Sequence, residues 1–453
     1  MKKFIALSLL MAVVMVATAC VTYLGDDEYY AFDSTIPIDI VAGFFAAADE
    51  IWDEDDGELW GFHLRAPLMF ADPISRHAVT NMPDPYGHFR RFGDVYVGIL
   101  PDDVFVSHTM ADFSGLSWGM VAWTPEVLLA DDFDFMRLLI HEGFHAVQFI
   151  EIVDRTWVGG QDDDIMIESA FARGSVLLEL EALLAALRQE GDERLAATMD
   201  ALSIRAERRY RYPQVHIFEN MMEINEGLAV FTEILLFDSV LELLDFYEPW
   251  MIGDAETTGL GTMFPYFSGA MYALLLRDAG ADWQHDLTFQ TDLAARLKEA
   301  LAIDDLTPFD QLELERYGYS EIMARQQTWV EEFAITMERV AAFARGPVMM
   351  IPGIWVFEYG ERLESLFVPG EHGRNNLIFF GDFSFSSANW RLELIDGHAK
   401  MGFPAGLYIA IYENVELCPD ARRATAPTWI LEIVDDNYKL EVLTSGKIEV
   451  VER

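Results

Sequence analysis

The residues of this chain best suited to do chemistry lie in the segment His141-Glu142-Gly143-Phe144-His145, which matches the pattern H-E-x-x-H. On a helix, side chains four residues apart share one face, so the imidazoles of His141 and His145 can bind a single metal ion. Glu142 can accept a proton from a water molecule on that ion. The pattern therefore predicts a zinc site. The alternative is a pair of partly buried histidines on a core helix.

An apolar, helix-compatible run, Phe135 to Ile150, must position these side chains. It is preceded by acidic residues, Asp131, Asp132 and Asp134, which are typical of a helix N-terminus. The segment 119–123 before it is predicted as a strand. We expect this strand to be either an ordinary core strand or a sheet edge that pairs with an extended peptide.

A catalytic zinc site usually has three protein ligands and one open position, so two histidines do not complete it. The third histidine of the metzincins is absent, because His145 is followed by Ala146-Val147-Gln148-Phe149-Ile150 without a Gly-x-x-His element. We therefore expect an acidic third ligand. Glu181 is one candidate, because it lies in an apolar helical stretch, where burial of a carboxylate is costly unless the group binds a partner such as a metal ion.

Two further segments resemble the gluzincin metallopeptidases, in particular their aminopeptidase N-like members. Asn225-Glu226-Gly227-Leu228-Ala229 is similar to the segment that carries their third zinc ligand, and Tyr266-Phe267-Ser268-Gly269 is similar to their Tyr-x-x-Gly segment. The resemblance covers a small part of the chain. It implies zinc as the cofactor, Glu226 as the third ligand and Tyr266 as the residue that stabilises the oxyanion of the tetrahedral intermediate.

The chain departs from this group in two ways. Glu226 follows His145 by 81 positions, much more than in the group, and Glu168 lies nearer to the usual separation. An inserted helical hairpin at 165–212 would account for the difference. The Gly-x-Met-Glu-Asn segment that reads a free amino terminus is also missing, because residues 119–123 lack its glutamate and asparagine. Exopeptidase specificity is therefore not expected.

Other charged residues near these segments have more ordinary interpretations. Arg205, Arg208, Arg209 and Arg211 form a basic cluster that we expect on a solvated helix face, with a carboxylate terminus or a phosphate as alternative partners. Glu223 and Glu233 flank Glu226 at helical offsets. Either of them is a candidate to orient a zinc-bound histidine.

The N-terminus is typical of an export signal. Lys2 and Lys3 precede an apolar run, residues 4–16, that is short for a membrane span. Ala17-Thr18-Ala19-Cys20 resembles a bacterial lipobox, which implies lipidation of Cys20; cleavage of an ordinary secretory signal near Ala19 is the alternative. We therefore expect an extracytoplasmic protein attached by lipid to a bacterial membrane.

The composition excludes some classes of function. The 453 residues include 76 acidic and 31 basic side chains, giving a net charge of −45, which disfavours nucleic acid as a partner because phosphates would be repelled. A hydrophobic content of 52% provides material for a large core, so disorder is not expected. With Cys20 acylated, Cys418 is the only remaining cysteine and no intramolecular disulfide is expected.

Length and patterning predict a multidomain α+β protein. The expected parts are a signal peptide at 1–19, a tether and helix at 20–57, a β-rich segment of the catalytic domain at 58–130, a mainly helical gluzincin-like domain at 131–345, and an all-β sandwich or barrel at 346–453. The expected function is zinc-dependent hydrolysis of peptide bonds in a peptide or protein substrate, and cell-wall peptides would be cleaved by the same chemistry. The alternative is a non-catalytic peptide- or cell-surface-binding lipoprotein on a degenerate peptidase scaffold.

Overall fold

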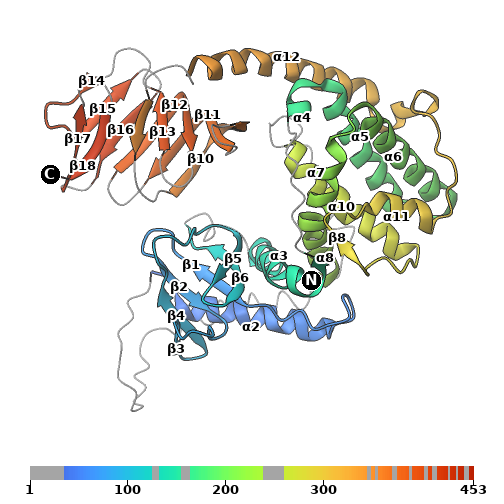
Figure 1. Ribbon diagram of the computed structural model, residues 1–453, viewed down its shortest axis with the longest axis horizontal. Coiled ribbons are helices and arrows are strands. Elements are labelled where there is room, and N and C mark those ends of the chain that lie inside the picture. Colours follow the sequence, from blue (N-terminus) through green and yellow to red (C-terminus); the bar gives the residue numbers. More distant parts are fainter. Residues whose placement is uncertain are drawn as a thin grey trace. The chain divides into compact units, whose positions relative to one another are not determined.

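The computed structural model describes residues 35–124, 132–154, 164–237 and 260–343, and in the C-terminal part residues 348–351, 356–369, 375–386, 390–401, 407–410, 416–426, 429–434, 437–442 and 448–452 (Figure 1). The fold is α+β, as predicted. The chain divides into two compact units, residues 1–54 with 65–146 and residues 55–64 with 147–453. Cys20 and the predicted signal peptide lie outside the described residues.

A six-stranded mixed sheet forms the centre of the first unit. Its strand order is β3 (Arg90–Phe92), β4 (Val95–Ile99), β2 (His77–Thr80), β1 (Leu68–Ala71), β6 (Leu116–Ala122) and β5 (Thr109–Phe113). β1 and β6 are parallel, with Leu68 opposite Gly119, and the other neighbours are antiparallel. Because β6 lies between β1 and β5, the predicted strand at 119–123 is a core strand and not an edge.

Both faces of the central strand β1 are buried, whereas β3 at one edge of the sheet is exposed; side chains alternate between the two faces along each strand. On one face, the ring of Phe70 in β1 stacks on Phe135 of helix α3 (Asp132–Glu151), with centroids 5.4 Å apart. Phe44 of helix α2 (Ile38–Asp55) lies 4.3 Å from the same Phe135 ring. The opposite face carries an apolar cluster of Met69, Ala71, Ala78, Phe89, Leu100, Trp118 and Met120. The motif helix α3 is thus anchored by aromatic packing on the sheet.

Helix α3 approaches β6 most closely at Gly119. A Cβ atom at this position would lie 2.5 Å from the carbonyl oxygen of Glu142 and 2.7 Å from the amide nitrogen of Gly143. Both distances are shorter than packed atoms allow. Glycine is therefore required where the strand meets the helical turn that carries the motif.

Replacing Gly119 with alanine is expected to lower the free energy of unfolding by about 1–3 kcal/mol, because an extra methyl group in a packed core forces the backbone apart. Gly43 offers a matched control on the exposed side of α2, where a Cβ atom meets nothing within 4 Å. There the same substitution is expected to stabilise by about 0.5–1 kcal/mol, since alanine is the better helix residue. Urea unfolding of both variants measures whether the free energy of unfolding falls or rises. A Gly119→Ala protein as stable as Gly43→Ala would contradict this account of the packing.

Helices dominate residues 164–343 of the second unit. Among the described residues they are, in chain order, α4 (Asp164–Glu168), α5 (Ala170–Arg188), α6 (Gly191–Arg211), α7 (Val215–Met222), the π-helical turn η1 (Glu223–Gly227), α8 (Leu228–Leu236), α10 (Leu260–Asp278), α11 (Leu293–Ala300), the short 3-10 helices η2 (Phe309–Gln311) and η3 (Leu314–Tyr317), and α12 (Tyr319–Phe343). The first part of the helical hairpin predicted at 165–212 consists of two helices, α4 and α5, because Ser169 caps α5 by accepting a hydrogen bond from the amide of Ala172 at 3.1 Å. α10 is buried along most of its length and forms the centre of this helical part.

The C-terminal part consists of antiparallel strands. One eight-stranded sheet follows the path β10 (Val356–Pro369), β11 (Asn375–Ser386), β12 (Trp390–Met401), β16 (Trp429–Ile433), β15 (Arg423–Ala426) and β14 (Glu416–Leu417), and β13 (Leu407–Ala410) pairs with β12 and with β9 (Val348–Ile351). β17 (Tyr438–Val442) and β18 (Ile448–Glu452) form a hairpin. Trp390 and Leu392 are buried and Arg391 is exposed, the alternation of a strand with one face on a core.

Within the segment 58–130, which is predicted to be β-rich, the apolar run 104–106 is a loop in the structure. The guanidinium of Arg76 donates hydrogen bonds to the carbonyl oxygens of Pro101 and Val104, and these bonds hold the segment in a turn. Residues 104–106 therefore do not pair with a neighbouring strand, although their sequence, Val-Phe-Val, is typical of one. Within the described part of the chain, no helix has both the length and the apolar character that crossing a membrane requires.

Candidate metal centre

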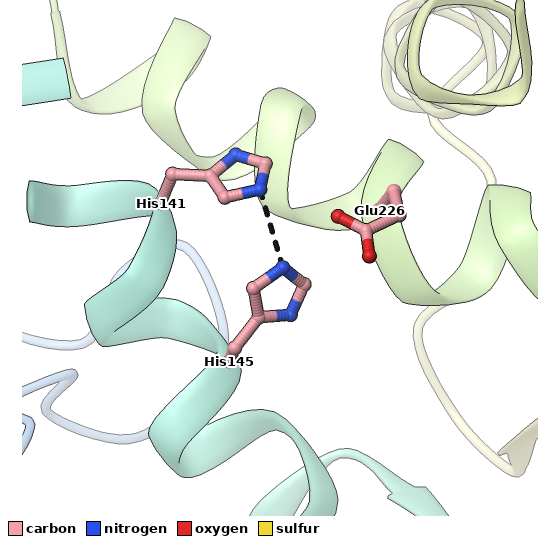
Figure 2. Close-up of side chains that lie close together, drawn as sticks. All are labelled: His141, His145 and Glu226. Carbon is pink, nitrogen blue, oxygen red and sulfur yellow. Dashed lines mark hydrogen bonds between the residues drawn. The ribbon is translucent and has the colours of Figure 1, made fainter. Parts of the chain in front are cut away.

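Helix α3 carries the three residues of the predicted motif. His141 is half-buried, and Glu142 and His145 are each 6% exposed. The Nε2 atoms of His141 and His145 lie 3.2 Å apart, and both rings extend from the same face of the helix (Figure 2). One helical turn thus presents two imidazole nitrogens to a single point, as the four-residue spacing predicts.

Glu226 joins this pair, although it lies far along the chain in η1. One ligand atom from each of His141, His145 and Glu226 falls within 4.8 Å of the other two. The carboxylate of Glu226 points toward the two rings (Figure 2). Its Oε1 accepts a hydrogen bond from Nδ2 of Asn225 at 2.6 Å, which orients the group. The structure therefore brings together two segments that the sequence separates widely.

Two imidazole nitrogens and one carboxylate oxygen suit a divalent transition metal. In a tetrahedral zinc site with bonds of about 2.0–2.1 Å, neighbouring ligand atoms lie about 3.3 Å apart. The 3.2 Å between the Nε2 atoms of His141 and His145 matches this spacing. A carboxylate oxygen of Glu226 lies within 4.8 Å of a ligand nitrogen of each histidine, at most about 1.5 Å more than this spacing. The residues therefore fit a zinc ion with one position left open, and the same ligand set also suits other divalent metals.

Gln148 belongs to this neighbourhood but not to the motif. It lies three residues after His145, on the same side of α3, and its side chain is buried. Its Nε2 donates hydrogen bonds to the carbonyl oxygens of Ile224 at 2.6 Å and Asn225 at 3.0 Å, directly before Glu226. A polar residue one turn after the second histidine, in an otherwise apolar run, is the sequence signal that would have revealed it.

The two other candidates for the third ligand lie outside the group. Glu168 ends α4 and is exposed. Glu181 is half-buried on α5 and lines a cavity of about 330 Å³, together with Leu180 and Arg316. Among the three predicted glutamates, Glu226 is the one that the structure places with the histidines.

Tyr266 is half-buried on α10, which crosses η1 at short range. A Cβ atom on Gly227 would lie 2.7 Å from the Cα atom of Gly269 and 2.9 Å from the carbonyl oxygen of Pro265. The glycine after Glu226 and the glycine three residues after Tyr266 therefore meet at this crossing. The two segments picked out separately in the sequence share one backbone contact, which sets the main chain of Tyr266 beside that of Glu226.

Three of the four arginines in the α6 cluster are not on a solvated face, which corrects the sequence-based prediction for them; Arg211 is exposed, as predicted, and pairs with Glu207 at 2.8 Å. Arg205 and Arg208 are buried, and Arg209 is largely so. The ion pairs are Arg205–Glu179 at 2.7 Å, Arg205–Glu223, Arg208–Glu179 at 2.6 Å, Arg208–Glu219 at 2.8 Å, Arg209–Glu219 at 2.7 Å and Arg209–Asp292 at 2.6 Å. Burial would raise the pKa of Glu179, but Arg205 and Arg208 hold it below its ordinary value. Arg205, Arg208 and Arg209 therefore join α6 to neighbouring elements through ion pairs.

Glu223, a predicted partner of a zinc-bound histidine, is part of this network instead. Its carboxylate accepts hydrogen bonds from the guanidinium of Arg205, through both oxygens, and from Oγ of Ser268 at 2.5 Å. Ser268 lies on α10, two residues after Tyr266. The side chain that starts η1 is thus tied to α6 and α10. The other predicted partner, Glu233, is buried on α8.

Comparison of the chain with protein-family models, with curated proteins and with solved structures gave no match. The resemblance to gluzincins therefore rests on the short segments around His141, Glu226 and Tyr266. A function for this protein has to be inferred from the chemistry and the geometry of these residues.

Proposed function

We propose that the protein is a zinc-dependent, gluzincin-like metallopeptidase that hydrolyses peptide bonds in a peptide or protein substrate. The observation that carries this proposal is the meeting of His141, His145 and Glu226, whose ligand atoms lie within 4.8 Å of one another. Glu142 is buried beside the first histidine. Three ligands, an open position and an adjacent carboxylate are the parts that a hydrolytic zinc centre needs.

The side chains have distinct roles in this mechanism. His141, His145 and Glu226 would hold the ion. When bound, zinc supplies Lewis acidity, which lowers the pKa of a water molecule and polarises the scissile carbonyl group. Glu142 accepts the proton that the attacking water loses and then delivers it to the nitrogen of the leaving amine. Tyr266 donates a hydrogen bond from its phenol to the developing oxyanion.

The proposal extends to the layout and location of the protein. Residues 58–345 would form the peptidase domain, in which the six-stranded sheet supports the motif helix. The antiparallel strands after residue 346 would close into a sandwich or barrel. The N-terminal sequence supports export and attachment through lipid on Cys20 to a bacterial membrane, outside the cytoplasm.

The purified wild-type protein is expected to bind a single zinc ion per chain and to cleave members of a broad peptide library. Removing the metal with a chelator is expected to abolish cleavage, and added zinc to restore it, because the hydrolytic chemistry requires the ion. Elemental analysis and mass spectrometry of the products measure the two properties. Zinc binding without cleavage would instead favour a peptide- or surface-binding lipoprotein. A metal-free wild type, purified without chelator, would contradict the zinc centre itself.

A further inference from the structure

The turn that carries Glu226 is not α-helical. In η1 the amide of Leu228 donates to the carbonyl oxygen of Glu223, five residues earlier, whereas an α-helix uses a spacing of four. Turns of this kind are rare and occur as single insertions within α-helices, frequently at functional sites. η1 therefore needs contacts from its neighbours to keep this shape in preference to a regular helix.

The first such contact comes from the helix that carries the histidines. The amide of Gln148 donates to the carbonyl oxygens of Ile224 and Asn225, which are both inside η1. A single buried side chain thus binds two consecutive carbonyl groups of the irregular turn. Because Gln148 lies one turn after His145, it fixes the distance between the histidine helix and the ligand turn.

The second contact holds the beginning of η1 through Glu223. Arg205 binds both carboxylate oxygens of Glu223, and Ser268 donates to one of them at 2.5 Å. All three side chains are at most 3% exposed, so water does not compete for these hydrogen bonds. The end of η1 is held in turn by the close crossing of Gly227 and Gly269. Contacts from neighbouring elements therefore hold η1 at its start, through Glu223, in its middle, through the carbonyl groups of Ile224 and Asn225, and at its end, through Gly227.

We propose that Gln148 and Ser268 are positioning residues of the metal centre, which hold η1 in the π-helical form that turns Glu226 toward His141 and His145. Relaxation of η1 to a regular α-helix would shift its register by one residue, which rotates a side chain by about 100° around the helix axis. Such a rotation would remove the carboxylate from the histidines. This inference rests on the proposed zinc function. It adds that Gln148 and Ser268 hold Glu226 in the position for binding before the metal is present.

The test compares Gln148→Met and Ser268→Ala with Ser175→Ala. Methionine keeps the length of Gln148 without its amide, and Ser175 is a matched control because it is a buried serine that bonds only within its own helix, to the carbonyl oxygen of Ala172. Zinc affinity is measured by competition with a chromogenic chelator, and the visible spectrum of bound Co²⁺ reports the coordination geometry. Hydrogen exchange of the metal-free proteins over residues 219–230 reports the turn itself.

Gln148→Met and Ser268→Ala are each expected to weaken zinc binding about 10–100-fold, the range for loss of a partner that orients a ligand. They are also expected to alter the Co²⁺ spectrum and to speed exchange in η1, while Ser175→Ala matches the wild type. Wild-type zinc affinity in both variants would overturn the inference and leave the proposed function standing. A wild type that binds no zinc would overturn the proposed function, and unchanged exchange in Gln148→Met would then overturn the inference as well.

Discussion

Replacing Glu142 with glutamine is expected to leave zinc bound and to reduce peptide hydrolysis by about 10²–10⁴-fold, the usual contribution of a general base. Glutamine has nearly the same size as glutamate, so the packing of α3 against Gly119 is preserved, but an amide cannot take a proton from water. Turnover assays and elemental analysis check the two halves of this expectation.

The same substitution at Glu151 is the matched control, because this residue lies at the exposed end of the same helix. Glu151→Gln is expected to retain wild-type zinc content and turnover. Wild-type turnover by Glu142→Gln would remove this residue from the proposed mechanism. Loss of zinc from Glu142→Gln would place the carboxylate among the metal ligands instead.

Removing a ligand is expected to have the larger effect on the metal. His145→Ala should contain no zinc after purification, and Glu226→Gln should bind it more weakly by well over the roughly 10–100-fold that loss of an outer partner costs. The reason is that each variant leaves only two protein ligands of the usual three. Zinc content and competition with a chelator measure the result.

Glu181→Gln and Glu168→Gln separate this ligand assignment from its alternatives. Both variants are expected to bind zinc as the wild type does, because neither carboxylate lies with His141 and His145. If Glu181→Gln or Glu168→Gln lost zinc while Glu226→Gln kept it, the third ligand would have been assigned to the wrong helix.

Much of the local structure was predictable because it depends on neighbouring residues. The apolar run before and after His141 predicted a helix, and α3 spans Asp132–Glu151. The segment 346–453 was predicted to be all-β, and the elements that the structure describes within it are strands. The apolar run at 104–106 is nevertheless a loop within the segment predicted to be β-rich, because its shape depends on hydrogen bonds from Arg76, which is distant in sequence.

The site was predictable in part, for the same reason. The spacing of His141 and His145 is a local property of a helix, and the structure has it. The meeting with Glu226 depends on how helices pack, and the sequence alone left Glu181 and Glu168 open as alternatives. A glutamine in an apolar run indicates that Gln148 needs a polar partner, but the sequence does not identify that partner, because it consists of two backbone carbonyl groups.

The arginine cluster shows the limit most clearly. Arg205 and Arg208 follow a helical spacing that fits an exposed face equally well. These arginines can be buried because Glu179, Glu219 and Glu223, on other helical elements, neutralise their charges. The burial can therefore be predicted only when arginines and glutamates are considered together. Removing one partner of such a buried ion pair costs about 3–5 kcal/mol of folding free energy. Which residues pair depends on how the helices pack, and a single segment of sequence does not determine this.

The π-helical turn has an evolutionary consequence. Since such a turn is an α-helix with one inserted residue, deletion of a single codon within 223–227 would restore a continuous α-helix from α7 into α8. The core would keep its helices, yet Glu226 would change phase and leave the histidines. Under the proposed function, deletion of one codon in this turn would therefore separate the zinc ligands without replacing any of them.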